Sequence, residues 1–161
     1  NTLSSTFYNS KLTYQNVPNG YLRAASCTLD SFEQQMISGK AYQIEIVLFK
    51  STTRDIIAFS LHGGSPLFIE FNQATLVWKE VTQEVFPELE SFTSKPTGGG
   101  APVFFKLPEI GLKIIATRDT QHRMILPDPQ RFFKQQMKQN PQRIKSIEFN
   151  TQTGMFSLHK K

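Results

Sequence analysis

The most suggestive pair of side chains for ligand chemistry is an indole and a carboxylate two residues apart. Trp78 is the single tryptophan of the 161-residue chain, and Glu80 lies two positions after it. If residues 74–81 form a strand, the alternation of side chains puts Leu76, Trp78 and Glu80 on one face. An aromatic ring can stack on the C–H groups of a sugar while a carboxylate accepts hydrogen bonds from its hydroxyls. The pair is therefore typical of a carbohydrate site, and a core tryptophan with Glu80 at its edge fits the pattern equally well.

Catalytic and metal-binding combinations are not recognisable in the sequence. His62, His122 and His159 are far apart and lie in no metal-binding spacing, and the single cysteine, Cys27, stands in no nucleophile motif. Four glutamates between residues 80 and 90 have no base among them and are typical of a solvated rim rather than a glycosidase pair. We therefore expect a protein that is not an enzyme and that uses no cofactor and no metal.

Positive charge is concentrated in the last quarter of the chain. Residues 118–161 hold nine basic and three acidic side chains, whereas residues 1–117 hold nine basic and ten acidic ones. Cations bind phosphates and aromatic rings stack on bases, so a basic segment that also contains phenylalanines can bind nucleic acid. The candidate basic patch comprises Arg131, Lys134, Lys138 and Arg143. The alternative, and the more common case, is a solvated charged surface without a dedicated ligand.

Alternating apolar and polar residues predict a mostly β structure. The clearest alternation places Tyr42, Ile44 and Ile46 on one face of a strand. Turn-forming sequences, such as Pro-Asn-Gly at residues 18–20, separate the candidate strands. Many short strands with frequent turns favour a two-sheet antiparallel β-sandwich. The candidate strands are residues 7–14, 21–29, 41–50, 55–62, 66–72, 74–81, 102–107, 111–117, 121–126, 143–150 and 154–159.

One or two short helices should decorate this sandwich, which we expect to be one domain over residues 1–161. Residues 130–138 follow an Asp-Pro pair that suits a helix N-terminus, and they place Phe133 and Met137 on one face. Residues 29–36 are the second candidate helix, in which Asp30 can act as the N-cap. No apolar run approaches the roughly 18 residues that a membrane-spanning helix needs.

The cellular setting is only weakly indicated. The chain begins with Asn1 rather than Met, which suggests a domain excised from a longer polypeptide or a processed product. A single cysteine excludes an internal disulfide, and none of the seven asparagines begins an N-glycosylation motif. Both observations favour an intracellular location.

The order of several segments resembles the galectin family of jelly-roll lectins. Residues 58–61 look like the first sugar-binding strand of that family, and residues 68–74 look like the second. The segment from Trp78 to Glu80 is similar to its tryptophan motif, and residues 141–149 with 155–158 resemble its closing strands. The resemblance covers about residues 40–158 and implies a galectin-like jelly roll.

The resemblance also implies a ligand site that departs from the family. Asn72, Trp78 and Glu80 fall on matching positions, whereas Glu70 stands in place of the sugar-binding histidine and Ala74 in place of the arginine. Without those donors, ordinary β-galactoside binding is not expected. We expect a non-catalytic binding module for a glycan or a protein partner. The alternatives are a scaffold domain that binds no sugar and nucleic-acid binding through the basic patch, and a homodimer is left open.

Overall fold

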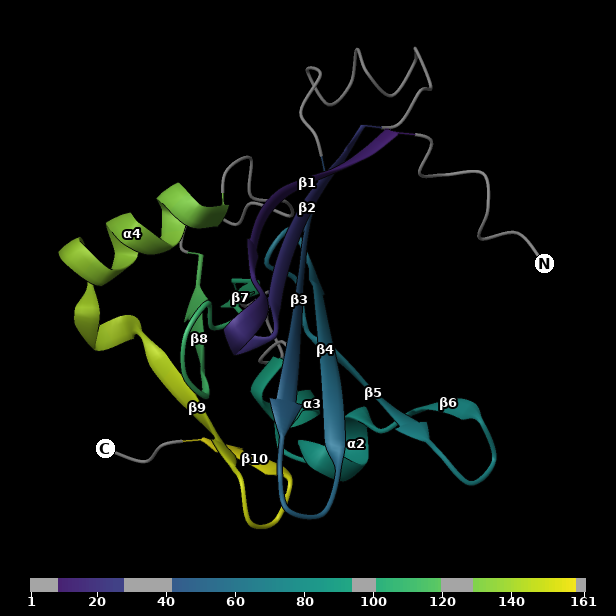
Figure 1. The fold of residues 1–161 in the computed structure, drawn as a ribbon. Helices are drawn as coiled ribbons and strands as arrows, with labels where there is room; N and C mark the ends of the chain where they lie inside the picture. Colours follow the sequence, from purple (N-terminus) through teal and green to yellow (C-terminus); the bar gives the residue numbers. More distant parts are fainter. Residues whose placement is uncertain (1–8, 28–41, 94–100, 120–128, 159–161) are drawn as a thin grey trace.

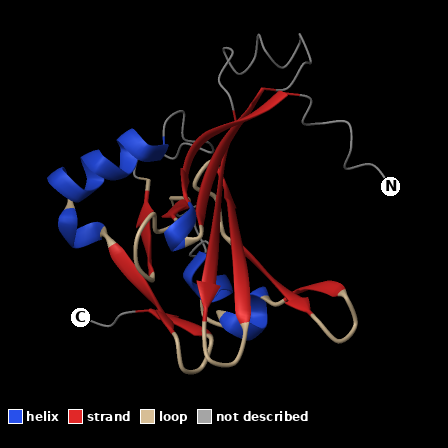
Figure 2. Ribbon diagram, in the orientation of Figure 1, coloured by secondary structure: helices blue, strands red, loops and turns tan. Residues whose placement is uncertain are grey.

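The computed structural model describes residues 9–27, 42–93, 101–119 and 129–158, whose strands form two antiparallel sheets (Figures 1 and 2). The larger sheet contains β1 (Asn9–Asn16), β2 (Tyr21–Cys27), β3 (Tyr42–Lys50), β4 (Asp55–Leu61), β5 (Leu67–Asn72) and β6 (Val77–Glu80). The smaller sheet contains β7 (Val103–Lys106), β8 (Lys113–Arg118), β9 (Lys145–Asn150) and β10 (Met155–Leu158). The predicted all-β, two-sheet architecture is confirmed.

In both sheets, neighbouring strands follow one another along the chain. Each sheet is therefore an up-and-down meander among the described strands, and the chain passes from one sheet to the other between β6 and β7. A jelly roll is built from Greek-key connections, which these two meanders do not contain. The jelly-roll topology is therefore not confirmed.

Tight turns fix the register of the larger sheet. Between β1 and β2, the 3-10 turn η1 (Val17–Asn19) ends at Gly20, whose φ of 64° favours glycine. A Cβ atom at Gly20 would lie 2.9 Å from the Cβ of Leu48, so the close approach of β2 to β3 also requires glycine. Between β5 and β6, the side-chain oxygen of Asn72 accepts hydrogen bonds from the backbone N–H groups of Ala74 (2.9 Å) and Thr75 (3.1 Å).

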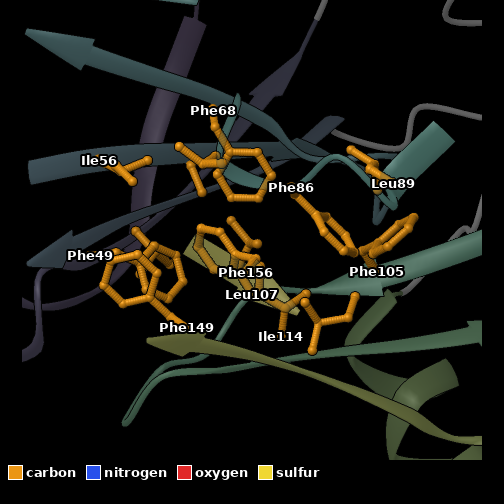
Figure 3. Packing of buried hydrophobic residues seen from close by; sticks show 14 of the residues in the cluster. Phe49, Ile56, Phe68, Phe86, Leu89, Phe105, Leu107, Ile114, Phe149 and Phe156 are labelled. Carbon is orange, nitrogen blue, oxygen red and sulfur yellow. The ribbon is translucent and has the colours of Figure 1, made fainter. Parts of the chain in front are cut away.

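A cluster of phenylalanines fills the space between the sheets (Figure 3). Phe156 of β10 lies at its centre, with ring centroids 4.6 Å from Phe68, 4.8 Å from Phe149 and 4.9 Å from Phe49. Figure 3 shows Phe68 and Phe149 on opposite sides of this layer. Alternate positions of β3, β4 and β9 supply further buried side chains, so one row of each of these strands faces the core.

Two short helices that the sequence analysis did not predict close one end of this core. After β6, α2 (Thr82–Val85) and α3 (Leu89–Thr93) bury Val85, Phe86 and Leu89. At four and five residues they are too short to show a helical period in the sequence. The glutamates of this region, which were expected to form a solvated rim, are exposed.

The longest described helix, α4 (Pro129–Gln139), covers the outer face of the smaller sheet. Phe132 and Phe133 pack with Phe104 of β7 and Ile115 of β8 in a second apolar cluster. The predicted helix at 130–138 is therefore confirmed, although Phe132 rather than Met137 accompanies Phe133 in the buried face, and Met137 is 42% exposed. The predicted helix at 29–36 and strand at 121–126 lie outside the described residues. Among the described helices, none is long and apolar enough to cross a membrane.

Candidate functional site

The outer face of the larger sheet is apolar across five strands. Val47, Phe49, Ile56, Ala58 and Phe68 point into the core, so the alternate positions of the same strands point away from it. We call this outward row the apolar face. Its members are Leu22 of β2, Ile44, Ile46 and Leu48 of β3, Ile57, Phe59 and Leu61 of β4, Leu67, Ile69 and Phe71 of β5, and Trp78 of β6.

No described helix covers this face. The helix α4 packs on β7, and α2 lies between β5 and β10. As a result, Leu61, Leu67, Phe71 and Trp78 are 48%, 43%, 39% and 53% exposed. Single exposed apolar residues are ordinary on protein surfaces, but a contiguous patch of them marks an interaction site.

The apolar face is hollowed at its β2–β3 side. A pocket of about 330 Å³ is lined by Leu22, Ile46, Leu48 and Ile57 of the face and by Val17 and Gly20 at the η1 turn. Val17 is 67% exposed, so the rim of the hollow is apolar as well. The hollow can therefore receive an apolar side chain from a partner.

An exposed aromatic pair lies at the opposite side of the face. Phe71 and Trp78 are direct partners across β5 and β6, and their ring centroids are 4.9 Å apart. The β5–β6 hairpin extends away from the smaller sheet, at the right of Figure 1, and all four residues of β6 are exposed. Glu80 pairs with Ile69 and so shares the face of Trp78, as the alternation predicted. Leu76, in contrast, precedes β6 in the turn, with a φ of 56°.

The other two predicted ligand residues lie on the opposite side of the sheet. Glu70 pairs with the buried Ile56 and Asn72 is two residues further along the same strand, so both face the inner side, away from Trp78. The four predicted residues therefore do not converge on one surface. Sequence alternation within one strand is local, but the relation between β5 and β6 depends on the turn that joins them.

Both inward residues also have internal partners. The carboxylate of Glu70 accepts hydrogen bonds from Nε (2.9 Å) and Nη2 (2.6 Å) of Arg54, in the forked geometry of a strong ion pair. These hydrogen bonds raise the pKa of Arg54 above its ordinary value, so its guanidinium group stays charged. The oxygen of Asn72 already caps the β5–β6 turn. Neither side chain is arranged to bind a ligand next to Trp78.

A buried carboxylate that the sequence analysis missed connects the two sheets and α4. Glu45 of β3 is 2% exposed. Its oxygens accept hydrogen bonds from the Tyr21 hydroxyl (2.7 Å), the Leu107 backbone N–H (3.2 Å) and the side-chain amide of Gln130 (2.8 Å). Burial raises the pKa of Glu45, and these hydrogen bonds oppose the rise. Glu45 is enclosed by its donors, so we assign it to positioning the elements rather than to ligand chemistry.

The basic patch is divided between two elements. Arg131, Lys134 and Lys138 follow helical spacing along the exposed side of α4, opposite its buried phenylalanines. Arg143 lies beyond the helix, in the 3-10 turn η2 (Pro141–Arg143), and lines a separate pocket of about 350 Å³ with Phe92, Arg118 and Lys145 among others. Nucleic-acid binding through this patch stays a prediction.

In the described ranges, no three His, Cys, Asp or Glu side chains come together as a metal site. His62 is buried in the turn after β4, with a left-handed φ of 51°, and Cys27 ends β2. His122 and His159 lie outside the described residues.

Comparison with known proteins adds no family to this description. No protein-family model matches the chain, and neither a curated protein nor a solved structure matches it significantly.

Proposed function

We propose that this chain is a non-catalytic protein-binding module and that the apolar face is its binding surface. The observation that supports this function is the contiguous row of outward apolar side chains from Leu22 to Trp78, of which four are 39–53% exposed. Leaving such a surface in water is unfavourable, and a partner that covers it gains the free energy of burial.

The distribution of charge around the face has the form of a protein interface. On strands β2 to β6, the charged side chains at outward positions are Lys50 and Asp55 at the β3–β4 hairpin and Glu80 on the edge strand. All three lie at the margin, and the centre of the face around Phe59 is uncharged. An apolar centre within a polar rim is the usual anatomy of a protein–protein contact.

Trp78 should be the largest single contributor to binding. About half of its side chain is exposed, which corresponds to roughly 130 Å² of a ring system that can bury up to about 250 Å². At about 25 cal/mol per Å², covering this area contributes about 3 kcal/mol. Tryptophan is also enriched among the residues that dominate binding energies.

A photo-crosslinking experiment tests the proposal. A photoreactive amino acid replaces Phe59, at the centre of the face, or Ile110, which is 74% exposed in the loop between β7 and β8. We expect a discrete protein adduct in the source cells from position 59 and none from position 110. Equal labelling from both positions, or no adduct from position 59, would refute this function.

A galectin-like, glycan-binding module is the second candidate. It is supported by the Phe71–Trp78 pair, whose half-exposed rings can stack on a sugar, and by Glu80 on the same face. A glycan array and a titration of Trp78 fluorescence test it, with Trp78→Ala as the matched variant. If no sugar is retained on the array and none changes the fluorescence, this candidate is rejected.

A further inference from the structure

We propose that the partner that covers the apolar face is a second copy of this chain, in a two-fold symmetric dimer. This inference rests on the proposed function of the face. Three properties of the face favour an identical partner over a different protein: its lack of charge, its self-complementary shape and its size.

The first property is the uncharged centre. Interfaces between permanently associated identical subunits are more apolar than contacts between proteins that also exist apart, because they are rarely exposed to water. The outward residues of β3, β4 and β5 between the hairpin ends are aliphatic or aromatic throughout. Because charge is limited to the margin, a free monomer would expose the apolar centre of the face to water, which is unfavourable.

The second property is the placement of the exposed aromatic pair and the pocket, which lie toward opposite edges of the apolar face. The Phe71–Trp78 pair lies on β5 and β6, whereas the pocket is lined mainly by β2 and β3 and ends at Ile57 of β4. The aromatic pair is level with the first residue of β4, because Phe71 follows Glu70, which pairs with Ile56. The pocket begins two residues further along β4, since Leu48 pairs with Ile57 and Ile46 pairs with Phe59.

A two-fold axis parallel to β4, in the plane of the contact, makes these features complementary. Such an axis exchanges the two sides of the face and keeps the position along the strand. The aromatic pair of each copy therefore faces the Leu48 end of the other copy's pocket, in the reciprocal contact that a closed two-fold interface requires. The two larger sheets would then pack face to face with aligned strands, the arrangement that twisted sheets prefer.

The third property is the size of the face. Five strands at a spacing of about 4.8 Å, each contributing about six residues at about 3.3 Å, give a flat area of roughly 500 Å². The relief of the side chains and the η1 turn increase the accessible area. Two copies would thus bury about 1,000 Å² or more in total, which is the minimum expected of a biological interface.

The same geometry supplies a specific test, because Phe59 of β4 would lie near the axis and face its own copy. Phe59→Glu and Phe59→Lys each place two like charges together in an uncharged contact, so each variant alone should be monomeric. An equimolar mixture of the two should recover a dimer, since glutamate then faces lysine. Ile110→Glu is the matched control for adding charge at an exposed apolar residue, because Ile110 belongs to the β7–β8 loop of the smaller sheet and not to the apolar face.

The experiment measures mass by light scattering and sedimentation at about 1–100 μM, a range that spans typical dimer affinities. We expect twice 18.4 kDa for the wild-type chain and for Ile110→Glu, the mass of one chain for each Phe59 variant, and twice that mass for their mixture. Circular dichroism establishes that the Phe59 variants are folded. If they are not, Trp78→Ala at the exposed edge replaces them and should raise the dissociation constant by about 100-fold or more.

A monomeric wild-type chain overturns the proposal, as does a mixture that stays monomeric or an unchanged dissociation constant in the folded Trp78→Ala variant. The crosslinking at position 59 separates this failure from failure of the binding function. An adduct with a different protein, combined with a monomeric chain, retains the binding face and rejects the second copy. A monomeric chain without any adduct rejects both.

Discussion

Removing the Tyr21 hydroxyl should destabilise the protein by an amount that increases with pH. Tyr21 and Glu45 are both buried, and the hydroxyl donates to the carboxylate at 2.7 Å. Burial raises the pKa of Tyr21, so its hydroxyl remains a donor over the whole accessible pH range. In Tyr21→Phe the ring still fills its site, and the change is limited to one hydrogen bond.

The sign of the pH dependence follows from the Glu45 carboxyl. Burial raises the pKa of Glu45 in the folded state above the usual value of 4.5. Protonation of Glu45 therefore stabilises the folded state, and this contribution to the free energy of unfolding has its full size below pH 4.5. This stability is lost as the pH rises through the folded-state pKa. The Tyr21 hydrogen bond lowers the pKa of Glu45. Tyr21→Phe therefore raises that pKa further, and the variant loses more stability than the wild type as the pH rises.

The magnitude follows from the charge of the acceptor. A neutral hydrogen bond contributes about 0.5–1.5 kcal/mol, and one to a charged group contributes about 1.5–3 kcal/mol. We therefore expect Tyr21→Phe to lower the free energy of unfolding by about 1 kcal/mol at pH 4 and by about 2–3 kcal/mol at pH 9.

Urea denaturation at intervals between pH 4 and pH 9 measures this difference. Tyr14→Phe is the matched control, because Tyr14 is 38% exposed and its ring packs against that of Tyr21. The control should change little at any pH. A destabilisation by Tyr21→Phe that is constant across the range, or larger at pH 4, would refute the assignment of Glu45 as a buried acceptor with a raised pKa.

Three further substitutions test the fold that presents the apolar face. Phe156→Ala should lower the free energy of unfolding by about 3–5 kcal/mol, because it empties the centre of the phenylalanine cluster; a loss below about 1 kcal/mol in urea denaturation would contradict that packing. Gly20→Ala should cost about 1–3 kcal/mol, since it combines a left-handed φ with a Cβ placed 2.9 Å from Leu48, and an unchanged melting temperature would contradict the turn geometry. Asn72→Ala should cost about 1 kcal/mol through loss of the turn hydrogen bonds while leaving the crosslinking at position 59 intact; loss of that adduct in a folded variant would show that Asn72 belongs to the binding surface after all.

The strands could be predicted from the sequence because every strand is recognisable from its own residues. Each predicted strand that falls on described residues overlaps an observed one, with boundaries that differ by a few residues. The helix α4 was predictable for the same reason, since the Asp-Pro pair at its N-terminus is a local signal. The predicted spacing of Phe133 and Met137 did not identify its buried face, because Met137 is exposed. In contrast, α2 and α3 form where the chain crosses between the sheets, and that crossing is absent from any local pattern.

The candidate site was predictable only within a single strand. The shared face of Trp78 and Glu80 follows from the two-residue period of β6. Asn72 was grouped with them because of its position in the family resemblance, but it lies on the other face. The turn that Asn72 itself caps determines which residues of β5 and β6 are paired, and a turn sets that register through its geometry rather than through alternation.

The sequence by itself determined that β3 would be a strand, and only the tertiary structure decided which of its faces is buried. Ile44 and Ile46 look like core residues, and Glu45 between them looks like a surface residue. The structure reverses this, because Val47 and Phe49 continue the row of Glu45 and pack against the smaller sheet. A buried carboxylate is tolerated only when donors satisfy it. Those donors come from Tyr21, Leu107 and Gln130, which are up to 85 residues away in sequence. The apolar face therefore exists because distant residues meet at Glu45 and turn the isoleucines outward.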